Sequence, residues 1–131
     1  MPNSVHRHNN PLVAGLACRH LASSIITDGH HLPPAVIQLV IQAKGVSSVY
    51  VVSDAAPVAG LPEGLYDWPA GKKVLVLSDG SVCDPENECF AGSGSTMMHC
   101  MNHLSGLGLC TLDELLQVGS FNQLKLITSG T

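Results

Sequence analysis

Charged and aromatic residues are both scarce in this sequence. They make up 12% and 4% of the 131 residues, whereas hydrophobic residues make up 45%. A soluble domain usually carries about 25% charged residues, and the mean hydropathy here is +0.25. The excess of apolar residues predicts a surface that something else covers.

Positive charge and long apolar runs are also lacking. Six Lys and Arg residues face ten Asp and Glu residues, so the net charge is -4. A nucleic-acid interface needs a basic patch, and a membrane span needs about 18 consecutive apolar residues. The sequence therefore predicts neither nucleic-acid binding nor a membrane-spanning segment.

The cysteines cannot all pair with one another in disulfide bonds. There are five of them at irregular spacing, and an odd number argues against a closed disulfide framework. Reduced thiols are typical of the cytoplasm, where we expect the protein to reside. A secretory signal is the weaker alternative, because the His-rich start and the Arg19-His20 pair directly after the apolar stretch of residues 11–18 fit one poorly.

A strand, a helix and a second strand are predicted in residues 21–56. Residues 21–26 and 48–52 are short apolar runs of the strand type. Pro33 and Pro34 suit the first turn of a helix, which Gly45 ends. Both strands are apolar throughout, as parallel strands covered on both faces are. This order of elements predicts an α/β fold with a parallel sheet.

The rest of the chain divides into three further segments. Residues 1–20 predict a loop and a short helix, and residues 57–90 predict β-hairpins with Asp-Gly turns. Residues 91–95 predict a flexible polar loop that precedes a helix over 96–104. Thr111 and Glu114 have capping-box spacing, so another helix is expected to begin there.

Two candidate sites follow the predicted strands. Asp54 lies at the end where parallel α/β enzymes place catalytic groups, and it can bind a metal or accept a proton. An ordinary turn or cap aspartate is the alternative. The residues Asp28, Gly29, His30 and His31 follow the other strand. A neutral imidazole beside Asp54 can bind a metal or a hydroxyl, unless this is a tight turn with solvent-exposed histidines.

Weaker candidates lie elsewhere. The backbone N–H groups of residues 91–95 can hold an anion or a polar ligand in front of a helix, although such loops are mostly linkers. Arg7 can bind a phosphate through its fork of donors, although a solvated surface arginine is the simpler interpretation. A zinc site is a further alternative, although its cysteines are spaced more widely than in the usual zinc motifs. Its ligands would be Cys83, Cys89, His99 and His103.

Several short motifs occur in a particular order along the chain. They occupy residues 25–31, 43–45, 51–55, 59–61, 63–66, 91–93 and 96–97. In this order and spacing they resemble the C-terminal part of the N-acetylglucosamine-6-phosphate deacetylases, which are metal-dependent amidohydrolases. The resemblance runs from about Arg7 to Leu126. It implies the C-terminal portion of a (β/α)8 barrel, namely the last two parallel strands and their helices, with a β-hairpin insertion.

The resemblance also implies a reaction and a role for each matching residue. The family removes acetate from N-acetylglucosamine 6-phosphate. Asp54 would be the catalytic aspartate, which deprotonates the metal-bound water and then protonates the leaving amine. His31 would contact the sugar, His30 being the weaker candidate, and Arg7 would help to hold the phosphate. The substrate pocket would be lined by Phe90, Ala91, Gly92 and Ser93.

The metal ligands of that family, a glutamate and two histidines on earlier strands, have no match in this sequence. The resemblance therefore implies one partial barrel domain over residues 1–131, inactive alone, whose zinc or iron is held mostly by residues outside the chain. We expect the chain to associate with itself or with the missing N-terminal barrel segment. The alternative is a non-catalytic remnant or a small α/β interaction module.

Overall fold

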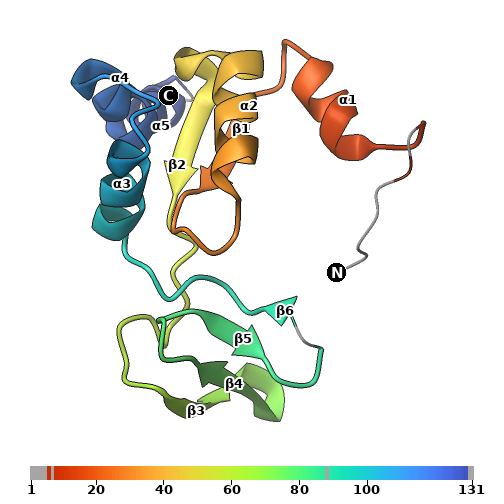
Figure 1. Cartoon of the computed structure of the whole chain (residues 1–131), viewed down its shortest axis with the longest axis vertical. Coiled ribbons are helices and arrows are strands. Elements are labelled where there is room, and N and C mark those ends of the chain that lie inside the picture. Colours follow the sequence, from red (N-terminus) through yellow and green to blue (C-terminus); the bar gives the residue numbers. More distant parts are fainter. Residues whose placement is uncertain (1–5, 7, 88, 130–131) are drawn as a thin grey trace.

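The computed structural model describes residue 6, residues 8–87 and residues 89–129, and it is an α/β structure with two lobes (Figure 1). The elements are, in chain order, α1 (Pro11–Ala17), β1 (Ser23–Ile26), α2 (Pro34–Lys44), η1 (Val46–Ser48), β2 (Val49–Val52), β3 (Gly64–Trp68), η2 (Pro69–Gly71), β4 (Lys72–Val76), β5 (Val82–Asp84), β6 (Cys89–Phe90), α3 (Met97–Gly106), α4 (Leu112–Leu116), η3 (Gln117–Phe121) and α5 (Asn122–Thr128).

The first lobe is built on the predicted strand–helix–strand unit, which is confirmed. β1 and β2 pair in parallel, with Ile25 opposite Val51, and α2 connects them. Proline occupies the first turn of α2, where its missing N–H is not needed, and Gly45 ends the helix with a positive φ of 72°. Figure 1 shows α2 beside β1 and the C-terminal helices beside β2.

A hydrophobic core fills one side of the parallel sheet. Its buried residues come from both strands and from three helical segments: Ile25, Ile37, Val40, Val49, Val51, Cys100, Leu104 and Val118. Side chains alternate along a strand, so Ser24 and Val52 point to the opposite face, where both are exposed. The expectation that both faces are covered is therefore wrong for the described part of the chain, which covers only one.

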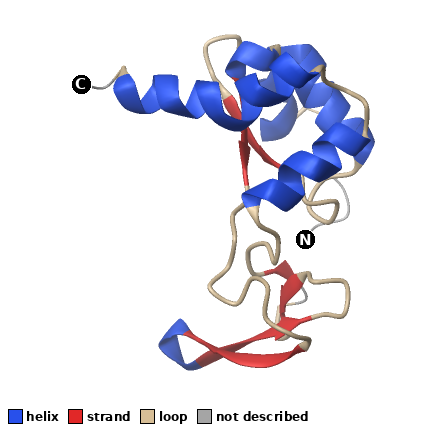
Figure 2. Ribbon diagram, turned by 90° about the vertical axis from the view of Figure 1, so that its left-hand side faces the viewer, coloured by secondary structure: helices blue, strands red, loops and turns tan. Residues whose placement is uncertain are grey.

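The second lobe is an antiparallel sheet (Figure 2), and its strands lie in the order β3-β4-β5-β6. The predicted Asp79-Gly80 turn joins β4 to β5. By contrast, β3 and β4 are joined by η2, where Ala70 adopts a left-handed φ of 64°. The lobe has its own small core, of Ala56, Val58, Val74, Val76 and Val82. The predicted hairpins thus form a sheet that packs apart from the parallel one.

Side chains fix the C-terminal helices. Thr111 and Glu114 form the predicted capping box at the start of α4. At the start of α5, the side-chain amide of Asn122 donates to the carbonyls of Val46 and Val49 at 2.7 and 2.6 Å, and Gln123 donates to Val51 at 2.9 Å. These bonds satisfy carbonyls of η1 and β2 and hold the start of α5 against both elements.

Residues 91–95 are not the flexible loop that their composition predicts. The N–H of Ala91 donates to Val82, and the N–H of Ser93 donates to Asp54 at 2.7 Å. The N–H of Ala56 donates back to Ser93 at 2.8 Å. This segment therefore ties the second lobe to the end of β2. Among the described residues, no helix combines the length and the apolar character needed to cross a bilayer.

Candidate functional site

An open hollow lies where the carboxyl ends of β1 and β2 meet. Its volume is about 710 Å³. It is lined by Ser24, Ile25, Ile26, His31, Leu32, Val52, Asp54 and Phe90. The fold thus brings together three residues that were singled out from the sequence, namely His31, Asp54 and Phe90. A mostly apolar hollow with a few polar groups at one end is the usual form of a small-molecule site.

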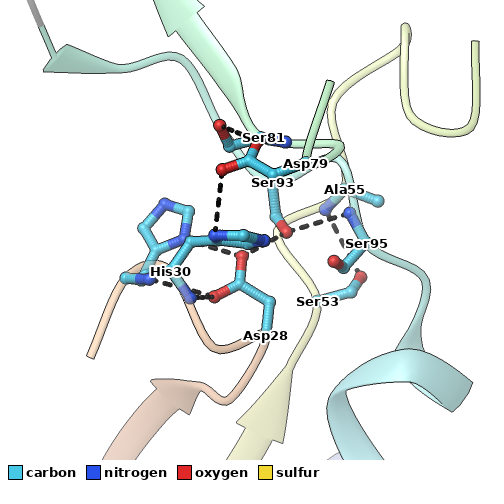
Figure 3. A network of polar contacts seen from close by, with 9 residues as sticks. Asp28, His30, Ser53, Ala55, Asp79, Ser81, Ser93 and Ser95 are labelled. Atoms are coloured by element: carbon cyan, nitrogen blue, oxygen red, sulfur yellow. Dashed lines mark hydrogen bonds and ion pairs between the residues drawn. The ribbon is translucent and has the colours of Figure 1, made fainter. Parts of the chain in front are cut away.

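Asp28 is the centre of a polar network behind this hollow (Figure 3). Its side chain is only 1% exposed. Oδ1 accepts from the backbone N–H groups of His30 and His31, each at 3.0 Å. Oδ2 lies 2.9 Å from Nδ1 of the His31 ring and accepts from the Ser93 hydroxyl at 2.6 Å. Both carboxylate oxygens are therefore used, as a buried charge requires.

The balance of burial and hydrogen bonding sets the ionisation of Asp28. Burial acts to raise its pKa, since it penalises the charged form. The hydrogen bonds from Ser93, from the backbone of His31 and His30 and from the His31 ring act in the opposite direction and prevail. The pKa of Asp28 consequently lies well below its ordinary value of 3.8. This carboxyl is a carboxylate, and so an acceptor only, in the folded protein at neutral pH.

A pH dependence of stability follows from the lowered pKa of Asp28. The unfolded chain takes up a proton near pH 3.8 while the folded chain does not, so this stabilisation is complete above that pH and is lost as the pH falls through the folded-state pKa. We expect the free energy of unfolding to decrease below about pH 4, and to decrease less steeply in Asp28→Asn. Urea unfolding at a series of acidic pH values measures this.

The control for this prediction is Asp67→Asn, which removes a carboxylate that is 90% exposed in β3. It should keep the wild-type slope. Hydrogen bonds also lower the pKa values of Asp79 and Asp84, so some slope remains in Asp28→Asn. An unchanged slope in Asp28→Asn would show that Asp28 contributes nothing to the acid sensitivity.

Asp54 lies two residues beyond β2, with its side chain exposed to the hollow. Its backbone adopts a left-handed φ of 49°, which aspartate tolerates better than most residues. Its carbonyl accepts from Ser93. Gly92 lies so close that a Cβ there would be 3.1 Å from this carbonyl. The strand end and the 91–95 segment thus hold Asp54 in place while its carboxyl remains free to meet a ligand.

Of the other residues predicted for the site, some line the hollow and others lie behind it. Phe90 lines it, and its ring centroid is 4.6 Å from that of His31. Ala91 packs against the core of the second lobe, and Ser93 is 1% exposed with its hydroxyl bonded to Asp28. Ala91 and Ser93 therefore support the wall behind the hollow. Arg7 lies outside the described residues.

His30 and the proposed zinc ligands are placed differently from His31. Nδ1 of His30 lies 3.8 Å from Asp79, in the turn of the second lobe, and His30 does not line the hollow. Within the part of the chain that the structure describes, no three His, Cys, Asp or Glu side chains are grouped so that they can hold a metal ion. The zinc site of Cys83, Cys89, His99 and His103 is therefore wrong.

The role of Asp28 is the feature that sequence reasoning missed. An Asp followed by Gly and two further residues predicts a turn in which the carboxylate accepts local N–H groups, and that part of the network is local. The bond from Ser93 spans 65 residues, and no spacing rule predicts it. Only the fold shows that Asp28 is buried and that it joins the two strand ends.

Comparison with known proteins identifies similar chains. No protein-family model matches. The N-acetylglucosamine-6-phosphate deacetylase of Lysinibacillus sphaericus is 30% identical over 128 residues, which are 94% of this chain and 32% of that protein. The chain thus spans about a third of the length of this curated relative. The comparison confirms the resemblance found in the motifs.

Solved structures agree. The N-acetylglucosamine-6-phosphate deacetylase of Thermotoga maritima matches 98% of this chain and 36% of its own, with a TM-score of 0.84 and 25% identity. The corresponding Mycobacterium smegmatis enzyme, an Asp-to-Ala mutant in complex with N-acetyl-D-glucosamine-6-phosphate, matches 89% of this chain and 30% of its own. Its TM-score is 0.75 at 21% identity.

Proposed function

We propose that the chain is the C-terminal part of the catalytic barrel of an enzyme like the N-acetylglucosamine-6-phosphate deacetylases to which it is similar. In this proposal residues 1–131 are one partial (β/α)8 domain, in which β1 and β2 are the last two barrel strands and residues 57–90 are an insertion. The proposed reaction is hydrolysis of the acetamide of N-acetylglucosamine 6-phosphate to acetate and glucosamine 6-phosphate.

One observation carries this proposal more than any other. Asp54 and His31 follow different strands and lie 23 positions apart in the chain, yet they line the same hollow at the carboxyl ends of a parallel pair. Enzymes with parallel α/β barrels place their catalytic groups at this end of the strands. A turn aspartate and a solvent histidine would not need to share a hollow.

Each site residue has a proposed role. Asp54 accepts a proton from the attacking water and returns it to the leaving nitrogen, since its carboxyl is exposed in the hollow and can reach a ligand. His31 contacts the sugar and Phe90 offers an aromatic wall beside it. Arg7 helps to hold the phosphate. Gly92 packs against Asp54, and Ala91 and Ser93 form the wall behind the pocket.

The proposed function requires a metal ion whose ligands lie mostly outside this chain. The described residues do not fit a metal site of their own. In the proposal the ligands for zinc or iron come mostly from the rest of the barrel, and the isolated chain is inactive. The five cysteines are free thiols, which supports a cytoplasmic location.

The uncovered face of the parallel sheet indicates where the rest of the barrel would dock. A second hollow, of about 430 Å³, lies on this side. It is lined by Ala22, Ser24, Tyr50, Val52, Gln123, Leu126 and Ile127. The Leu126 and Ile127 side chains are 64% and 72% exposed. A curated relative is about three times as long as this chain, so we propose that the missing N-terminal segment covers this face.

A chimera tests the proposed reaction. The segment of the Lysinibacillus sphaericus enzyme that matches this chain is replaced by residues 1–131, and deacetylation of N-acetylglucosamine 6-phosphate is assayed with zinc or iron(II) added. We expect metal-dependent release of acetate by the chimera and none by the chain alone. A folded chimera without turnover would favour the non-catalytic remnant or interaction module.

Association of the chain with the missing segment gives a separate prediction. We expect residues 1–131 to form a one-to-one complex with the remaining part of the Lysinibacillus sphaericus enzyme in analytical ultracentrifugation. Ile127→Asp should weaken the complex at least about tenfold, because it places a charge on the apolar face. Leu112→Asp, at a residue of α4 that is 73% exposed and lines neither hollow, should not. Self-association without the complex would contradict the proposed partner.

A further inference from the structure

We propose that Asp28 is a positioning residue, which holds the His31 ring as the tautomer protonated at Nδ1 and so presents Nε2 as a hydrogen-bond acceptor. The assignment of this acceptor to the sugar substrate rests on the proposed function. The protonation pattern itself rests only on the contacts of Asp28, and it can be measured in the chain alone.

The direction of each hydrogen bond to Asp28 determines where the proton on the His31 ring lies. A carboxylate has no proton to donate, and three of its four close partners are donors: the backbone N–H groups of His30 and His31 and the Ser93 hydroxyl. Nδ1 of His31 lies 2.9 Å from Oδ2, so it must carry a hydrogen. An unprotonated nitrogen at that distance would place its lone pair against a lone pair of the Asp28 carboxylate, whose side chain is 1% exposed.

The other ring nitrogen has the opposite role. In a neutral imidazole one nitrogen donates and the other accepts, so a proton on Nδ1 leaves Nε2 as the acceptor. The His31 side chain is 18% exposed and lines the hollow together with Asp54. The Phe90 ring packs 4.6 Å from it, tilted by 36°, and restricts its rotation. A ligand in the hollow would therefore meet a fixed acceptor, which selects an O–H or N–H donor.

The same network connects to Asp54. Ser93 donates its hydroxyl to Asp28 and its backbone N–H to the carbonyl of Asp54, at 2.6 and 2.7 Å. One buried residue thus joins the group that orients His31 to the backbone that carries Asp54. The bridge links the backbones of the two strand ends, which supports a site where both groups meet one ligand.

The test is the protonation pattern of His31 in the 15N-labelled chain, followed by long-range 15N–1H NMR at a pH of about 8.5, where an ordinary imidazole is neutral. We expect an N–H signal at Nδ1 and a bare Nε2 in the wild type. In Asp28→Asn the two backbone N–H groups hold the amide oxygen at the Oδ1 position, so the NH₂ group takes the place of Oδ2. That group donates to Nδ1, and the tautomer should invert.

Two further variants separate orientation by Asp28 from a general effect of charge. Asp79→Asn removes a carboxylate beside His30, and Ser93→Ala removes one donor but leaves the Asp28–His31 pair. Both should keep the wild-type tautomer. A wild-type ring protonated at Nε2, or an unchanged tautomer in folded Asp28→Asn, would overturn the proposal. The wild-type spectrum tests the proposed tautomer even if Asp28→Asn does not fold. A chimera without turnover would contradict the proposed function but not the tautomer of His31.

Discussion

Asp54→Asn in the chimeric deacetylase should lower kcat/KM by about 10³-fold, within the usual range for loss of a general acid–base group. An amide cannot accept a proton from the attacking water or return it to the leaving nitrogen. Asparagine has nearly the same shape and also tolerates the left-handed backbone at this position, where φ is 49°. The fall in activity should therefore come without a loss of fold, as judged by an unchanged thermal midpoint.

The matched control is Asp67→Asn, which removes the same charge from an exposed site in β3 and should leave kcat/KM within about twofold. The loss in Asp54→Asn should lie in kcat and leave KM almost unchanged, because the carboxyl acts on protons in the transition state. Turnover above a tenth of the wild-type value in Asp54→Asn would remove Asp54 from the proton-transfer role.

Much of the fold was predictable because its signals are local. Pro34 and Gly45 delimit α2, Thr111 and Glu114 cap α4, and the apolar runs mark β1 and β2. Each of these depends on residues within a few positions of one another. The parallel pairing follows from the strand–helix–strand order alone, and this order places His31 near Asp54.

The parts that could not be predicted depend on contacts between distant segments. The composition of residues 91–95 indicates a flexible loop, yet Ser93 is 1% exposed and bonded to both Asp28 and Asp54. The apolar strands indicate a sheet covered on both faces, yet the described chain covers one. The apolar character of a strand indicates that a face is suited to burial, but not which segment covers it.

Gly94→Ala is expected to have the largest effect on stability among the glycine substitutions. A Cβ at residue 94 would lie 1.7 Å from the carbonyl oxygen of Gly80 and 2.9 Å from its carbonyl carbon. These atoms are backbone, in the turn between β4 and β5, so no side chain can rotate away. The turn or the 91–95 segment must move. We expect the free energy of unfolding to fall by about 3 kcal/mol, the upper part of the usual range for overpacking.

The position of Gly94 makes this more than a local effect. It follows Ser93, which joins the two strand ends, so a displacement of the segment also strains the bonds to Asp28 and Asp54. Urea unfolding followed both by far-ultraviolet circular dichroism and by Trp68 fluorescence reports on the helices and on the second lobe. Both midpoints should decrease in Gly94→Ala, because the segment belongs to both lobes.

Gly106→Ala is the control, since a Cβ at residue 106 meets nothing within 4 Å and the residue ends α3. Alanine restricts the unfolded chain and favours the helix, so this variant should be as stable as the wild type or more stable by about 0.5–1 kcal/mol. If Gly94→Ala also kept its stability, the close packing of residue 94 on the turn would be wrong. In that case the contact of residue 94 with the Gly80 turn would not be what holds Ser93 between the two lobes.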